Sequence, residues 1–123
     1  MATDHDIEQF IGDSFASIWD LEMLSVLLRE PDQRLARSEL VSRLRASEVV
    51  VEQGIRSLTS SGIATLDGEG WLRFQPVNDH VGECAQQASA FYARFAGRAR
   101  RIIVARQSPG LDAFADAFRW RKD

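Results

Sequence analysis

The chain of 123 residues has one cysteine, Cys84, and no apolar run that approaches the ~20 residues a membrane span needs. A single cysteine excludes an internal disulfide framework and is typical of a reducing compartment. The first ten residues, MATDHDIEQF, are acidic rather than basic and apolar, so we expect no secretory signal. These absences predict one small cytoplasmic domain without a membrane segment.

The sequence also lacks the residue patterns of common catalytic and metal centres. Residues 67–70, DGEG, fit a hairpin turn rather than a phosphate-binding loop, and no nucleophile is placed with a base. His80 and Cys84 stand four residues apart on one predicted helix, but a structural zinc site needs four ligands. We therefore expect no enzymatic activity, no metal and no cofactor, and we interpret Cys84 as a small buried apolar residue.

Positive charge is scarce in the first part of the chain. Residues 1–77 hold 7 arginines against 13 acidic residues, whereas residues 78–123 hold 7 arginines and one lysine against 5 acidic residues. Proteins that bind nucleic acid usually carry their positive charge on the element that contacts it. Here the cationic excess lies in the C-terminal third instead.

Apolar residues at helical spacing predict a mainly α-helical fold. A first helix carries Ile7, Phe10, Ile11 and Phe15, and we expect Gly12 to interrupt it. Ser17 and Asp20 form a capping-box pattern for a second helix, IWDLEMLSVLLRE, which Pro31 ends. Residues 38–45 predict a short helix, and Ser47 caps the next one, whose inward residues are Val51, Ile55 and Leu58.

A β-hairpin is predicted directly after these helices. Gly62 has the position of a helix C-terminal glycine, and residues 63–74 form two short strands around the DGEG turn. Three helices, with a tight turn between the last two, followed by a hairpin describe a winged helix-turn-helix. We expect residues 1–77 to form this winged helix with an N-terminal helical extension.

Residues 78–123 are predicted to be a helical region of the same domain. From Asn78 to about Arg106 a heptad-like stripe predicts one helix of about 28 residues, hence about 42 Å long. Such a stripe packs either on the chain itself or on a second copy, and the excess length favours a homodimer. The stripe comprises Val81, Ala85, Ala88, Tyr92, Phe95, Ala99 and Ile102. Residues 108–123 predict a further short helix with Leu111, Phe114 and Phe118 on one face.

Residues 17–63 resemble the winged helix of MarR-type and related bacterial regulators. The resemblance rests on a helix ending near PDQ, a helix of the form SELVSRL, and a third helix ending in L-x-x-x-G-I. The whole chain, including AFADAFRWRKD at residues 113–123, is also similar to a group of small proteobacterial winged-helix proteins. Fold resemblance of this kind covers both DNA-binding proteins and protein-docking modules.

The resemblance implies a transcriptional regulator that binds double-stranded DNA as a dimer, with the third helix in the major groove. By position, the residues implied to face DNA on that helix are Ser47, Val49, Val50, Glu52, Gln53 and Arg56. Arg37 and Arg43 of the preceding helix and Arg73 of the wing would meet phosphates.

The outward residues of the third helix also fit a different function. Glu48 and Glu52 would be repelled by phosphates, and the wing tip carries Asp67 and Glu69 instead of arginine or lysine. Val49 and Val50, flanked by carboxylates, suit a basic protein partner. The alternative is therefore a winged-helix protein-interaction module, in transcription or signalling, that does not bind DNA.

Overall fold

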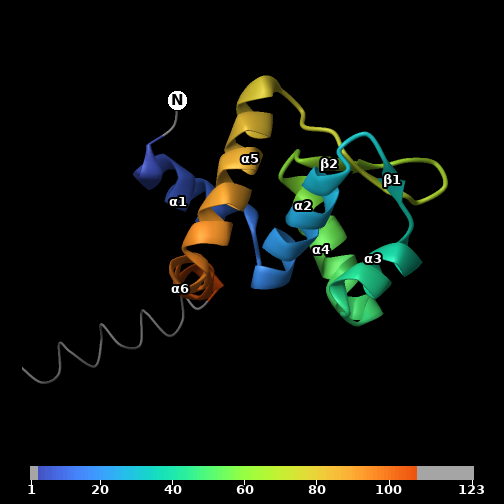
Figure 1. Ribbon diagram of the computed structural model, residues 1–123, viewed down its shortest axis with the longest axis horizontal. Helices are drawn as coiled ribbons and strands as arrows, with labels where there is room; N and C mark the ends of the chain where they lie inside the picture. The colour runs from blue at the N-terminus through green and yellow to red at the C-terminus, as the bar shows by residue number, and fades with distance from the viewer. Residues whose placement is uncertain (1–2, 108–123) are drawn as a thin grey trace, which may run out of the picture.

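The computed structural model describes residues 3–107, which form a mainly helical fold with a small three-stranded antiparallel sheet (Figure 1). This arrangement is compatible with a winged-helix-like fold. The elements are α1 (Asp4–Ser14), α2 (Ile18–Arg29), β1 (Arg34–Leu35), α3 (Arg37–Leu44), α4 (Glu48–Ser60), β2 (Ala64–Leu66), β3 (Leu72–Phe74), α5 (Asp79–Arg94) and α6 (Ala96–Gln107). The terminal helix predicted over residues 108–123 lies outside the described residues.

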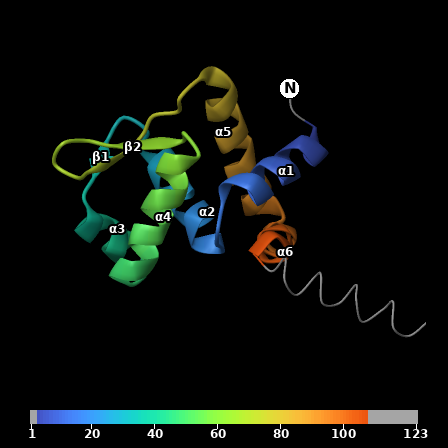
Figure 2. The same ribbon diagram turned by 180° about the vertical axis from the view of Figure 1, so that it is seen from behind.

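Helix α2 is the central element of the molecule. It packs against α4 and α3 on one side and against α5 and α6 on the other. Consequently α3, α4 and the sheet lie at one end of the molecule, and α1, α5 and α6 lie at the other (Figures 1 and 2). The apolar core runs through both ends, and Leu21, Leu24 and Leu27 of α2 are fully buried within it.

The predicted start of α2 and the predicted end of α4 are confirmed, and both are set by local hydrogen bonding, whereas α3 begins and ends one residue earlier than predicted. Asp20 Oδ2 accepts hydrogen bonds from the backbone N–H groups of Ala16 (2.7 Å) and Ser17 (3.2 Å), which fixes the start of α2. Helix α4 ends where Gly62 takes a positive φ of 75°. The N–H of Ile63 then bonds to the carbonyl of Leu58 (3.0 Å), as in a Schellman cap.

The turn between α3 and α4 is short and conformationally unusual. Arg45 adopts the left-handed region with φ 53° and is the one non-glycine residue of the described chain with a positive φ. This conformation is uncommon for a residue with a Cβ, and it lets α4 follow α3 after only three residues.

The hairpin is confirmed, but the sheet has a strand that the sequence did not predict. Strands β2 and β3 pair in antiparallel register, with Thr65 opposite Arg73. The third strand, β1, has two residues and pairs with the other edge of β3, placing Leu35 opposite Leu72. Two residues are too few to show an alternating pattern, so β1 is defined only by its pairing with β3.

The expected interruption of the first helix at Gly12 is wrong. Helix α1 continues through Gly12 to Ser14. A Cβ at this position would lie 3.1 Å from Cγ of Arg106 and 3.4 Å from Cγ2 of Ile102. Gly12 therefore permits α1 and α6 to approach closely, and it does not break the helix.

The prediction of one long helix from Asn78 is also wrong, because the helix breaks at Phe95. This residue has φ −132° and ψ 54°, outside the helical region, and it separates α5 from α6. The break turns α6 so that it packs against α1. Ala99 and Ile103 are buried as a result, whereas a straight continuation of α5 would carry them beyond the body of the molecule.

The stripe predicted as a dimer interface mostly packs within the chain. Ala85, Ala88 and Ala99 are 0% exposed, so they cannot meet a second copy in this structure. Val81, Tyr92 and Ile102 are half-buried against the same core. Of the seven stripe residues only Phe95, at the break, is substantially exposed. The homodimer stays a prediction, but its proposed seam does not exist as one continuous surface.

Within residues 3–107, none of the helices combines the length and the apolar character required to span a bilayer.

Candidate functional site

Helix α4 presents one buried and one exposed face. Ser47 caps its start by accepting a hydrogen bond from the N–H of Val50 (3.2 Å), as predicted. Val51, Ile55 and Leu58 are buried, which confirms the predicted inward face. The opposite face is open to solvent and could contact a partner.

The exposed face of α4 is polar with a single large apolar residue. Ser47, Gln53 and Arg56 are exposed, as expected for contact residues. Val49 is 66% exposed, but Val50 is half-buried. The predicted pair of exposed valines is therefore reduced to Val49.

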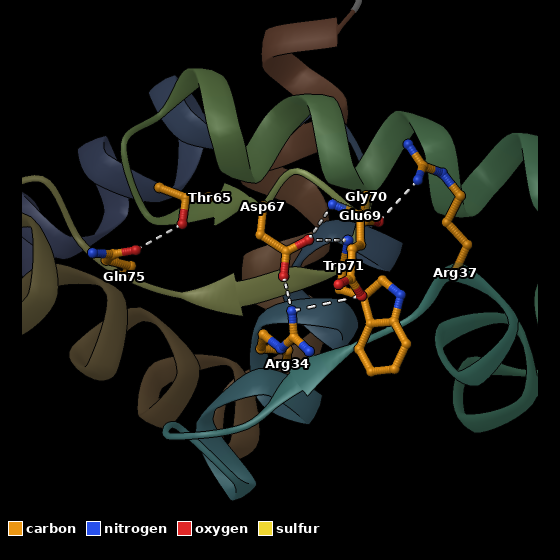
Figure 3. A network of polar contacts seen from close by, with 8 residues as sticks. All are labelled: Arg34, Arg37, Thr65, Asp67, Glu69, Gly70, Trp71 and Gln75. Carbon is orange, nitrogen blue, oxygen red and sulfur yellow. Dashed lines mark hydrogen bonds and ion pairs between the residues drawn. The ribbon is translucent and has the colours of Figure 1, made fainter.

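Arg37 connects α4 to the hairpin turn. Its guanidinium forms an ion pair with Glu52 of α4 and donates a hydrogen bond to the carbonyl of Gly70 (2.9 Å; Figure 3). Gly70 has a positive φ of 81°, and a Cβ there would lie 2.8 Å from the Arg37 guanidinium. Arg37, predicted to contact phosphate, is therefore paired with a carboxylate of its own chain, and it links the hairpin turn to α4.

Arg43, also predicted to contact phosphate, lies between two carboxylates. Its guanidinium is 3.3 Å from Glu30 and 3.7 Å from Glu39. All three side chains are partly exposed, so the pairs are weak individually. Together they still reduce the positive field that Arg43 would offer to DNA.

The acidic wing tip is built around Asp67. Its carboxylate accepts hydrogen bonds from the backbone N–H groups of Trp71 (3.0 Å) and Glu69 (2.9 Å) and pairs with Arg34 (Figure 3). These contacts, the Trp71 N–H foremost, lower the pKa of Asp67 below its ordinary value. Arg34 also lies 4.8 Å from the centre of the Trp71 ring. Asp67 thus stabilises the turn through these backbone hydrogen bonds, and the guanidinium of Arg34 neutralises its charge.

Arg34 and Arg45 are two exposed arginines of this region that were not predicted as site residues. Arg34 is 33 residues from Asp67, and only the pairing of β1 with β3 brings them together. Arg45 is exposed in the turn before α4. It is the last residue of the helix predicted over residues 38–45, two residues before the cap Ser47, and this closeness to the turn was the available signal.

Within α3, α4, the sheet and the turns that join them, three arginines form no ion pair with the described residues: Arg45, Arg56 and Arg73. They lie on the turn before α4, on α4 and on β3 respectively, and all three are exposed. These side chains are the cations that remain available to an anionic partner.

A cleft of about 510 Å³ lies between α1 and α5 at the other end of the molecule. Cys84 Sγ and His80 Nε2 are 3.7 Å apart in its wall, which confirms that they share one helix face. Burial raises the pKa of the Cys84 thiol, so the less reactive protonated form is favoured. Among residues 3–107, no three histidine, cysteine or acidic side chains gather in a group that could hold a metal ion.

Comparisons with protein-family models, curated proteins and solved structures give no match to this chain.

Proposed function

We propose that the chain is a winged-helix regulator of transcription that binds double-stranded DNA through α4, as a homodimer. The order α2, β1, α3, α4, β2, β3 with strand order β1-β3-β2 supports this fold. In a winged helix the counterpart of α4 enters the major groove and the β2–β3 hairpin lies over the adjacent backbone.

The observation that carries the proposal is the composition of the exposed face of α4. Gln53 can form paired hydrogen bonds with adenine, Arg56 with guanine, and Val49 can contact a thymine methyl group. Exposed Arg45, in the turn before α4, and exposed Arg73, on β3, would supply phosphate contacts. Arg37 holds the wing next to α4, so both elements are arranged for one partner.

The alternative, a protein-docking module, is favoured by a different observation. A groove of about 450 Å³ lies between α3 and α4, and its lining comprises Val41 and Val51, the carboxylates Glu48 and Glu52, and Arg37 and Ser38. With Arg37 and Arg43 paired to carboxylates, this part of the surface is less positive than its arginines suggest. An apolar groove lined by two carboxylates and one arginine, which is itself paired with Glu52, suits a basic peptide.

A gel-retardation experiment with a fragment library of the source genome separates the two functions. Retardation of some fragments, with affinity that falls steeply as salt rises, is the expected result. Arg56→Ala should weaken binding by roughly tenfold. Arg94→Ala, at the end of α5 in the other half of the molecule, removes the same charge and should have little effect.

Absence of retardation at low salt would eliminate DNA recognition by α4. The groove between α3 and α4 would then be the primary candidate site. Equal losses for Arg56→Ala and Arg94→Ala would indicate non-specific attraction instead of recognition by α4.

A further inference from the structure

A groove of about 380 Å³ lies between the start of α1, the second half of α5 and the break at Phe95. Its apolar lining residues are Ile7, Ala90, Phe91 and Phe95. The rings of Phe91 and Phe95 lie side by side, with their centres 5.3 Å apart. Ala90 is exposed, and Phe95 is 42% exposed although it is aromatic. Apolar side chains that gather in an open groove are typical of a surface that binds an apolar partner.

The C-terminal tail of the chain, residues 108–123, has a sequence that suits this groove. The tail lies outside the described residues, and its sequence predicts a helix with Leu111, Phe114 and Phe118 on one face. An amphipathic helix that lays its apolar face into an apolar groove is a common form of protein recognition. The tail therefore supplies the kind of surface that the groove lacks.

The charges of the tail and of the groove are also complementary. The tail is acidic in its first half, with Asp112 and Asp116, and basic at its end, with three cations in residues 119–122. The groove is lined by one charge of each sign, Asp4 of α1 and Arg94 of α5. These charges favour one direction of the tail, with its acidic half beside Arg94 and its basic end beside Asp4. They add little affinity, because exposed ion pairs are weak.

The tail of the same chain is poorly placed to fill the groove. Helix α6 leads away from it, since Arg106 pairs with Asp13 near the end of α1, whereas the groove lies at the start of α1. The 12 residues of α6 carry the chain about 18 Å from the break at Phe95. A helix folded back from that point would lay its apolar face along α6, where Arg100 and Arg101 are exposed. Only its last residues would approach the groove.

We infer that the groove binds the tail of a second copy of the chain, with Leu111, Phe114 and Phe118 facing its apolar lining. In a two-fold dimer each copy donates its tail and receives the tail of its partner, so two grooves are filled. The groove lies at the opposite end of the molecule from α3, α4 and the sheet, so the exchange leaves the exposed face of α4 open in both copies (Figure 1). The inference rests on the homodimer of the proposed function and names the segment that joins the copies.

Sedimentation of full-length variants over a range of concentrations tests this exchange. Phe114→Asp puts a carboxylate on the apolar face of the tail. It should weaken the dimer by at least roughly a hundredfold, because each copy loses one buried aromatic ring. Ala113→Asp is the matched control, since it adds the same charge on the other face of the predicted helix, and it should leave the dimer intact. Circular dichroism checks that both variants are folded.

Disulfide trapping identifies the copy that supplies the tail. One chain combines Cys84→Ala, which removes the native thiol, with Ala90→Cys in the groove. The other combines Cys84→Ala with Ala115→Cys, next to Phe114, and keeps the three apolar residues of the tail. Mild oxidation of the mixture should give a covalent dimer of the two chains. Its yield should be roughly tenfold higher than with Ala113→Cys in place of Ala115→Cys, because a disulfide forms only at short range.

The possible results separate the exchange from the proposed function. A wild type that sediments only as a monomer removes the homodimer and the exchange together, whereas DNA binding is decided by retardation. A dimer that persists in Phe114→Asp, or that Ala113→Asp weakens equally, overturns the exchange and leaves the homodimer in place. In a single chain that carries both Ala90→Cys and Ala115→Cys, an internal disulfide without any mixed dimer would assign the groove to the chain's own tail and contradict the inference.

Discussion

At the scale of single residues, ion pairs within the chain determine which arginines are free to contact a partner. Arg37 and Arg43 lie where the sequence predicts phosphate contacts, yet each meets a glutamate of the same chain. Arg37 and Glu52 are 15 residues apart, so their contact depends on how α3 and α4 pack. The sequence shows that these charges exist, but only the folded chain shows which of them are already matched.

Tyr92 offers a residue-scale prediction because it is the only tyrosine in the chain. Burial, and then its hydrogen bond to Glu22, raise the pKa of Tyr92 from 10.0 to about 12. An absorbance titration of the tyrosine should therefore have its midpoint near 12 in the folded protein. Glu22→Gln should lower the midpoint only partly, since burial remains.

The raised pKa of Tyr92 also determines a pH dependence of stability. The folded state favours the neutral phenol, so its contribution to the free energy of unfolding is complete below pH 10. It is lost as pH rises from 10.0 to about 12. Tyr92→Phe should lack this decline when unfolding is followed across that range. A wild-type midpoint at 10 would contradict both effects.

At the scale of elements, the sequence predicts those whose ends are defined locally. Asp20, Ser47 and Gly62 set helix ends through contacts with near neighbours, and each was found where its pattern placed it. Strand β1 and the break at Phe95 were not predicted, because both depend on contacts between segments that are far apart in the sequence. The first exists through pairing with β3, and the second accompanies the packing of α6 on α1.

The contact between α2 and α4 gives the element-scale prediction. A Cβ at Gly54 would lie 2.7 Å from Cε and 3.1 Å from Sδ of Met23, so a larger side chain would push the helices apart. Gly54→Leu should lower the free energy of unfolding by about 1–3 kcal/mol in a denaturant titration. Gly68→Leu is the matched control, because a Cβ there meets nothing within 4 Å. Equal stabilities would contradict the close packing at Gly54.

At the scale of the whole molecule, the packing of α5 and α6 limits how two copies of the chain could associate. Most residues of the stripe that suggested a dimer are buried in the core of the same chain. The large apolar side chains that remain exposed on the described part of α5, α6 and the break between them are Phe95 and Val104. A dimer formed by the described part of α5 and α6 would use this smaller surface. This correction could not come from periodicity, because packing on the chain and packing on a copy require the same spacing.

Sedimentation of the full chain tests the proposed homodimer. We expect a dimer in the wild type and a shift to monomer in Phe95→Asp, because a carboxylate cannot be buried in an apolar interface without cost. Val77→Asp, which alters an exposed apolar side chain outside α5 and α6, should leave the dimer intact. A wild type that sediments as a monomer at high concentration would refute the homodimer.

The central position of α2 has a consequence for how the protein unfolds. Its buried leucines belong to the apolar core that both ends of the molecule share. Removing α2 would therefore expose apolar surface on α3 and α4 and on α5 and α6 at the same time. Neither end retains a complete core alone, so the chain should lose its structure in a single cooperative transition.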